Sequence, residues 1–109
     1  MSAGNPAAWH IGLIGYGEVG RILAEDLRAL GVRVSAYDVK LAGAAGDAMR
    51  SHAETHGVTL AASHAALAAQ ADLVVSAVTA SQAVPVAQAC APALRRGAYF
   101  LDLNSASPG

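Results

Sequence analysis

Short apolar runs alternate with stretches of helical periodicity along the chain. Residues 10–14 form an apolar run that ends at a glycine, and residues 18–30 carry apolar side chains at helical spacing. Residues 32–37 then alternate in the manner of a strand, which stops at the polar Asp38. Strand, helix and strand within about thirty residues predict a βαβ unit with two parallel strands and a right-handed crossover.

The same alternation continues through the rest of the chain. We expect helices over residues 43–56 and 82–94, a small helix that Ser63 caps and that ends near Gln70, and strands over residues 58–61, 73–78 and 99–103. Gly31 and Gly97 are expected to end the helices that precede them. Continuous apolar strands indicate burial on both faces. The pattern predicts an α/β fold of the Rossmann type, a doubly wound parallel sheet with strand order 3-2-1-4-5 that is truncated after strand five.

Composition and charge narrow the class of protein. The chain of 109 residues has room for one domain, and its 54% hydrophobic and 14% charged residues indicate a globular domain with an apolar core. Seven basic and eight acidic side chains give a net charge of −1, so we do not expect a nucleic-acid partner.

A membrane partner and a secretory route are not expected either. Residues 73–94 contain no charge, but polar side chains and two prolines interrupt them, so we interpret them as a strand and a helix. The first nine residues lack the basic start and apolar run of a secretory signal, and a single cysteine cannot form an internal disulfide. A cytoplasmic location is therefore expected.

A G-x-G-x-x-G pattern lies between the first predicted strand and the first predicted helix. The first glycine permits a tight turn, the second lets the backbone approach a diphosphate, and the third allows close packing of helix on strand. Glycine-rich turns also occur for structural reasons, but this position favours dinucleotide binding. The predicted cofactor residues of this turn are Gly15, Tyr16, Gly17, Glu18, Val19 and Gly20.

Asp38 follows Gly20 by 18 residues, at the tip of the second predicted strand. An acid at that place accepts hydrogen bonds from the ribose hydroxyls of NAD, and its charge repels the 2′-phosphate of NADP. Lys40 lies in the same loop and can attract that phosphate, so NAD is the expected cofactor and NADP stays open. The alternative for Asp38 is a plain turn residue.

Three segments carry a resemblance to a known family. The glycine turn from Ile11 to Gly20, the strand end around Asp38, and the sequence DLNSASP from Asp102 to Pro108 resemble the β-hydroxyacid dehydrogenases, the group of 3-hydroxyisobutyrate and 6-phosphogluconate dehydrogenases. The third segment is the most particular of the three. The resemblance implies a nicotinamide cofactor and a small hydroxy-acid substrate.

The resemblance also implies positions around the reacting groups. It places Asn104 and Ser105 beside the nicotinamide and the substrate, and the backbone of Val78 and Thr79 against the cofactor. A helix cap after the fifth strand explains the first pair equally well, and a strand-to-helix turn explains the second.

The chain departs from that family in ways that affect catalysis. No residue corresponds to the family's general acid and base lysine, and its Ser-Gly-Gly substrate loop and all-helical second domain are absent. We therefore interpret residues 1–109 as an incomplete dinucleotide-binding domain, about the first third of such an enzyme, with no assigned catalytic residue. We expect cofactor binding without turnover by this chain alone; whether it is an enzyme, and whether it forms a homo-oligomer, stay open.

Two other functions compete with a dehydrogenase domain. A non-catalytic dinucleotide-binding or regulatory module uses the same glycine turn and needs no substrate pocket. A methyltransferase that binds S-adenosylmethionine usually has an acid two residues before the first glycine, where this chain has Leu13.

The remaining candidates are expected to be structural. His52 and His56 stand four residues apart on a predicted helix, but Glu54 is one place late for an H-E-x-x-H motif and no third ligand is near in the sequence. We expect solvated helix histidines and no metal site. Cys90 is interpreted as a small core residue and Trp9 as an anchor on the edge of the sheet.

Overall fold

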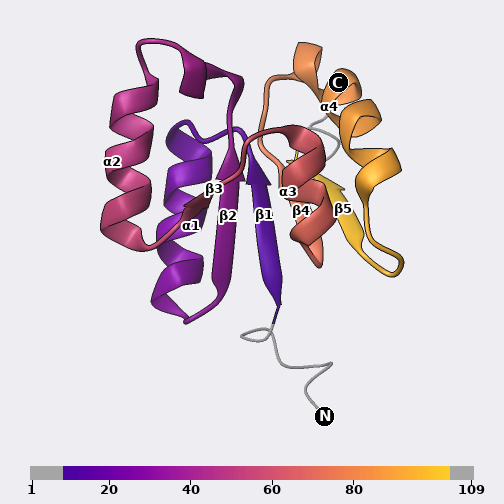
Figure 1. Cartoon of the computed structure of the whole chain (residues 1–109), viewed down its shortest axis with the longest axis horizontal. Coiled ribbons are helices and arrows are strands. Elements are labelled where there is room, and N and C mark those ends of the chain that lie inside the picture. The colour runs from indigo at the N-terminus through magenta and orange to yellow at the C-terminus, as the bar shows by residue number, and fades with distance from the viewer. Residues whose placement is uncertain (1–8, 104–109) are drawn as a thin grey trace.

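Five parallel strands form the sheet at the centre of the fold. The computed structural model describes residues 9–103, and its strands pair in the order β3-β2-β1-β4-β5, all in parallel (Figure 1). The strands are β1 (His10–Ile14), β2 (Arg33–Tyr37), β3 (Thr59–Leu60), β4 (Leu73–Ser76) and β5 (Tyr99–Asp102). The predicted strand order and the α/β fold of the Rossmann type are confirmed.

Helices cover both faces of this sheet. They are α1 (Glu18–Ala29), α2 (Gly46–His56), α3 (His64–Gln70) and α4 (Ala80–Cys90), with two short 3-10 helices, η2 (Val39–Ala42) and η3 (Ala91–Ala93). Residues of α1 and α2 share one buried cluster with Ile11 and Leu13, whereas residues of α3 and α4 share another with Ile14. Because alternate residues of a strand point to opposite faces, α1 and α2 lie on one face of the sheet and α3 and α4 on the other (Figure 1).

The first βαβ unit follows the sequence prediction, and the segment after it differs. Gly31, with φ +81°, follows α1 as expected. The helix predicted over residues 43–56 begins only at Gly46, because Gly43 is extended and a turn leads from it into the helix; a 3-10 turn over Val39–Ala42 comes before both. The carboxylate of Asp38 accepts the Lys40 N–H at 2.8 Å and so caps that turn. At α3 the predicted cap is confirmed, since the Ser63 hydroxyl accepts the Ala66 N–H at 3.0 Å.

The last predicted helix is shorter than expected at its carboxyl end. It begins at Ala80 and ends at Cys90, where η3 follows with Pro92 in it. Pro85 also lies within α4, so a missing proline N–H does not by itself end this helix; the chain becomes extended at Leu94, after η3. Gly97 does not end α4 and lies, with φ +85°, in the turn before β5. The uncharged stretch is thus a strand and a helix, and no helix within residues 9–103 has the length and apolarity needed to cross a membrane.

The strand β5 lies at one edge of the sheet and is only half covered. Within the described residues it pairs with β4 alone. Tyr99 and Leu101 are exposed, whereas Phe100 packs against the cluster of α3 and α4. The ring of Trp9 stacks on Tyr99 with centroids 6.2 Å apart, so Trp9 is an anchor at the sheet edge as predicted.

We expect the thiol of Cys90 to be inert in the folded chain. Cys90 is fully buried, and burial raises the pKa of its thiol to about 11. Because the thiolate is the reactive species, a raised pKa leaves little of it near neutral pH. Labelling with dithionitrobenzoate at about pH 8 should be very slow in the native chain and rapid after unfolding in urea. Rapid labelling of the native chain would contradict this burial.

Candidate functional site

The carboxyl ends of β1 and β4 open onto a crevice. After β1 the chain adds β2 and β3 on one side of that strand, and later β4 and β5 on the other side. The strand order therefore reverses between β1 and β4, and open α/β sheets bind ligands at such a switch point. The crevice has a volume of about 370 Å³. It is lined by Gly15, Gly17, Asp38, Val39, Lys40, Ala77, Val78, Thr79 and Gln82.

Two glycines of the turn are required by close backbone approaches. Gly15 has φ +92°, its N–H donates to the Tyr37 carbonyl at 2.9 Å, and an added Cβ would lie 2.7 Å from the Ala77 carbonyl oxygen. A Cβ on Gly20 would lie 2.0 Å from the carbonyl oxygen of Gly15. These contacts are the tight turn and the close packing of helix on strand that the glycine pattern predicts.

Gly17, the second glycine of the pattern, has open space around it. A Cβ on Gly17 would meet nothing within 4 Å. Gly17 is the N-cap residue of α1 and has no side chain that could cap the helix. The backbone bond from Arg21 to Gly17 is a first-turn hydrogen bond of the helix, so the N–H groups of Glu18 and Val19 precede it. Exposed N–H groups at a helix start, beside a residue without a side chain, fit a diphosphate.

Asp38 connects the end of β2 to the glycine turn. Its carboxylate oxygens accept the N–H groups of Tyr16 and Lys40, each at 2.8 Å. A carboxylate offers about four acceptor positions, so these two bonds leave positions for the hydroxyls of a ribose. Lys40 lines the same crevice as Asp38.

The side chain of Tyr16 lies in the core and not in the crevice. The ring is fully buried, and its hydroxyl forms a 2.5 Å hydrogen bond with Nδ1 of His52. Burial raises the pKa of Tyr16 to about 12. Its backbone N–H is already bonded to Asp38. Any contact of Tyr16 with a cofactor is therefore left to backbone atoms other than this N–H.

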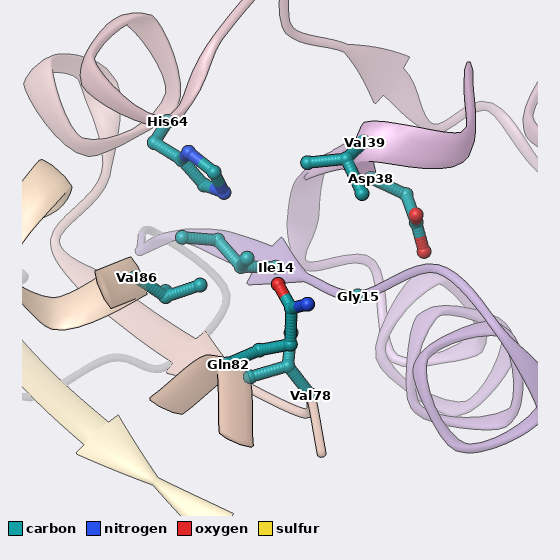
Figure 2. Close-up of a pocket in the computed structure, with 8 residues that line it drawn as sticks. All are labelled: Ile14, Gly15, Asp38, Val39, His64, Val78, Gln82 and Val86. Carbon is teal, nitrogen blue, oxygen red and sulfur yellow. The ribbon is translucent and has the colours of Figure 1, made fainter. Parts of the chain in front are cut away.

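Two residues that the sequence analysis did not assign to the site lie at the same opening. His64 and Gln82 line a small inner recess of about 20 Å³ together with Ile14, Gly15, Asp38, Val39, Val78 and Val86. Figure 2 shows His64 and Val39 facing each other across the end of β1, with Gln82 beside Ile14. Both residues lie in the first turns of helices that follow strands, and such turns gather at one edge of a parallel sheet. That position is the signal that could have found them.

A second recess lies on the other side of Asp38. It has a volume of about 360 Å³ and is mainly apolar, with Arg50 as its basic side chain. The Arg50 guanidinium donates to the Leu41 carbonyl at 3.0 Å and to the Asp47 carboxylate at 2.7 Å. Its lining also includes Tyr37, Val39, Ala42, Leu60, Ala61 and Ala62.

Four of the other predicted site residues lie in the described part of the chain, and two lie outside it. Glu18 and Val19 are exposed at the start of α1, and Val78 and Thr79 line the crevice after β4. Asn104 and Ser105, the predicted substrate residues, lie outside the described residues.

The expectation of solvated helix histidines is wrong for His52. The side chain of His52 is only 13% exposed, and its Nε2 lies 2.8 Å from Oε2 of Glu25 on α1. The hydrogen bond from His52 lowers the pKa of the Glu25 carboxyl. Glu25 and His52 are 27 residues apart in sequence, so local spacing could not show this contact.

The fold and this crevice define a Rossmann-type dinucleotide-binding domain. The model of a protein family described as "NADP oxidoreductase coenzyme F420-dependent" matches residues 10–105. The chain belongs to this family, and it is an NAD(P)-binding oxidoreductase domain. A comparison with curated proteins gives no match.

Solved structures agree with this fold. A conserved hypothetical protein from Sinorhizobium meliloti 1021 is 34% identical with a TM-score of 0.81, over 87% of this chain and 32% of that protein. The 3-hydroxyisobutyrate dehydrogenase of Mycobacterium tuberculosis is 24% identical with a TM-score of 0.74, over 86% and 31% of the two chains. Arogenate dehydrogenase from Synechocystis is 21% identical with a TM-score of 0.73, over 85% and 32%. The chain thus spans about a third of the length of these proteins.

We expect Gly20→Ala to destabilise the fold. Alanine in place of a helical glycine normally stabilises a helix, but here its Cβ would collide with the backbone oxygen of Gly15. Overpacking that moves the backbone costs about 1–3 kcal/mol, and this contact with a backbone oxygen should lie at the upper end of that range. Urea unfolding followed by circular dichroism measures the loss, and a Gly20→Ala chain as stable as the parent would contradict the close approach.

Gly17→Ala should separate binding from stability. Its Cβ has open space, so the unfolding free energy should fall by only about 1 kcal/mol or less, whereas the methyl group occupies the position that a diphosphate approaches. We expect NADH to bind about tenfold more weakly or worse. Titration with NADH, followed by nicotinamide fluorescence, tests this, and unchanged affinity would place the diphosphate elsewhere.

Proposed function

We propose that this domain binds the nicotinamide dinucleotide for an oxidoreductase that transfers a hydride between NAD(P) and a small hydroxy acid. The observation that carries the proposal is the crevice at the switch point, where an open glycine, the exposed start of α1 and the Asp38 carboxylate meet. Each of these groups suits a different part of a dinucleotide, and together they set its direction along the crevice.

The residues divide the cofactor between them. The amides at the start of α1 would bind the diphosphate, and Asp38 would accept hydrogen bonds from the adjacent ribose. The mainly apolar recess beside Asp38 suits the adenine ring. Val78, Thr79 and Gln82 line the crevice on the β4 side, where the nicotinamide would lie. The nicotinamide supplies the hydride chemistry, and these residues hold its ring.

We propose NAD as the preferred cofactor. The Asp38 carboxylate is held in place by two backbone N–H groups, so it cannot easily turn away from the negative charge of a 2′-phosphate. Lys40 and Arg50 are the basic side chains that line the two openings beside Asp38 and would favour NADP. The family description names NADP instead. A measured preference between NAD and NADP therefore tests whether the Asp38 charge acts on the cofactor.

The proposed substrate is a small hydroxy acid, bound near Asn104 and Ser105. The proposal rests on the resemblance of the segment from Asp102 to Pro108, and the fold likeness to a 3-hydroxyisobutyrate dehydrogenase agrees with it. Hydride transfer needs both carbons held at near-attack distance. We therefore propose that the chain by itself binds cofactor without measurable turnover. Coenzyme F420, named in the family description, is the second candidate for the hydride partner.

Asp38→Ala is expected to weaken NADH more than NADPH. The variant loses the ribose acceptor for both cofactors and the repulsion for NADPH alone, so the ratio of the two affinities should shift towards NADPH by about tenfold. Titrations with NADH and NADPH, followed by nicotinamide fluorescence, measure that ratio.

The ratio of the NADH and NADPH affinities also controls for a general disturbance of the loop in this variant. Asp38→Ala removes the acceptor for the N–H groups of Tyr16 and Lys40, and any disturbance of the loop weakens both cofactors together. Asp38→Asn keeps one acceptor oxygen and removes the charge, so it should shift the ratio in the same direction. Equal losses for both cofactors in both variants would mean that Asp38 does not contact the ribose. No binding of either cofactor to the parent chain would refute the proposed function.

The substrate class has a separate test. Addition of 3-hydroxyisobutyrate should change the fluorescence of bound NADH, and Asn104→Ala should weaken that response by about tenfold through loss of a hydrogen bond to a charged group. A response to coenzyme F420 and none to the hydroxy acid would assign the hydride partner to F420 instead. Formation of NADH by the chain from NAD and the hydroxy acid would contradict the expected lack of turnover.

A further inference from the structure

Three potential metal ligands meet where α1 and α2 pack together. They are Glu25 from α1 and His52 and His56 from α2, and their ligand atoms all lie within 4.8 Å of one another. The residues of α1 and α2 that form the core cluster lie on the face of the sheet opposite α3 and α4. The group shares no residue with the crevice, so it is a second candidate site.

The spacing of these atoms suits one shared ion. A tetrahedral zinc ion with bonds of about 2.0–2.1 Å separates its ligand atoms by roughly 3.3 Å. Oε2 of Glu25 lies 2.8 Å from Nε2 of His52 and 3.9 Å from Nε2 of His56. The longer distance exceeds a hydrogen bond but lies within the range of an ion pair when His56 is protonated, so Glu25 faces both histidines. Changes of roughly half an ångström would bring both distances to the zinc geometry, and the ligand atoms of His52 and His56 lie within 4.8 Å of each other.

His52 already has the outer partner that metal-binding histidines require. Its Nδ1 lies 2.5 Å from the hydroxyl of the buried Tyr16. A bound ion needs the lone pair of Nε2, which puts the imidazole proton on Nδ1, from where it is donated to the Tyr16 oxygen. This second contact fixes both the orientation of the ring and the nitrogen that faces Glu25.

The end of α2 is held against α1 independently of these ligands. Arg28 of α1 donates from Nε to the carbonyl of His56 at 3.1 Å and from Nη1 to the carbonyl of Val32 at 3.0 Å. The rings of His52 and His56 lie on one side of α2, with centroids 4.4 Å apart. The backbone at His56 is therefore held in place without an ion. The side chains of His56 and Glu25 are partly exposed, so an ion can reach them from solvent.

We propose that Glu25, His52 and His56 bind one Zn²⁺ ion that links α1 to α2. Two imidazole nitrogens and a carboxylate oxygen are ligands that Zn²⁺ prefers, and three protein ligands leave the fourth position to water. The ion joins residues that are far apart in the sequence, so its binding stabilises the folded chain.

Zinc titration of the untagged chain, without nucleotide, tests the proposal. Calorimetry should find one Zn²⁺ per chain, and Co²⁺ in its place should give the intense visible absorption of a tetrahedral site. With free Zn²⁺ at a hundredfold excess over its dissociation constant, the unfolding temperature should rise by about 10 °C and return after chelation.

Matched variants decide which residues bind the ion. Glu25→Gln and His56→Gln replace partly exposed side chains and should each weaken Zn²⁺ at least about tenfold, with unchanged circular dichroism. Glu54→Gln, at an exposed position of the same helix, should bind Zn²⁺ like the parent. Equal affinity in all of these chains, or no zinc-dependent rise of the unfolding temperature in the parent, would overturn the site. Neither result would bear on nucleotide binding.

Discussion

The hydrogen bond from the Tyr16 N–H to the Asp38 carboxylate holds the functional end of this domain together. It joins the turn after β1 to the loop after β2, and it fixes the carboxylate that faces the crevice. The same residue sends its ring into the core, where the hydroxyl meets His52 of α2. One buried tyrosine thus connects the glycine turn, the acid of β2 and the interface of α1 with α2.

The division of roles within the glycine turn follows from backbone contacts alone. Gly15 and Gly20 lack side chains because carbonyl oxygens occupy the space, whereas Gly17 leaves its space open. A compact turn alone requires Gly15 and Gly20. Packing does not require the glycine at position 17, which lies next to N–H groups that precede the first helical bond.

The sequence predicted best what depends on local pattern. The first strand, α1 and β2 were placed within a residue or so, because their apolar spacing and glycines are read over short distances. The start of α2 was missed because Gly43 is extended and a turn follows it, and the end of α4 was missed because the chain tightens into the 3-10 turn of η3 after Cys90. At the candidate site, the spacing predicted Gly15, Gly17 and Asp38, and the structure places all three along one crevice. His64, Gln82 and the contact of Glu25 with His52 depend on which elements become neighbours, and no local pattern contains that information.

The open flank of β5 has a consequence for how the domain behaves in solution. Within the described residues β5 has one partner strand, so its outer side there presents a row of amide and carbonyl groups, and Tyr99 and Leu101 add apolar surface beside that row. Such a flank is a template on which another polypeptide can extend the sheet. High concentrations of the isolated domain therefore favour strand pairing between molecules at β5. A charged residue in place of Leu101 would oppose that pairing and keep concentrated samples monomeric.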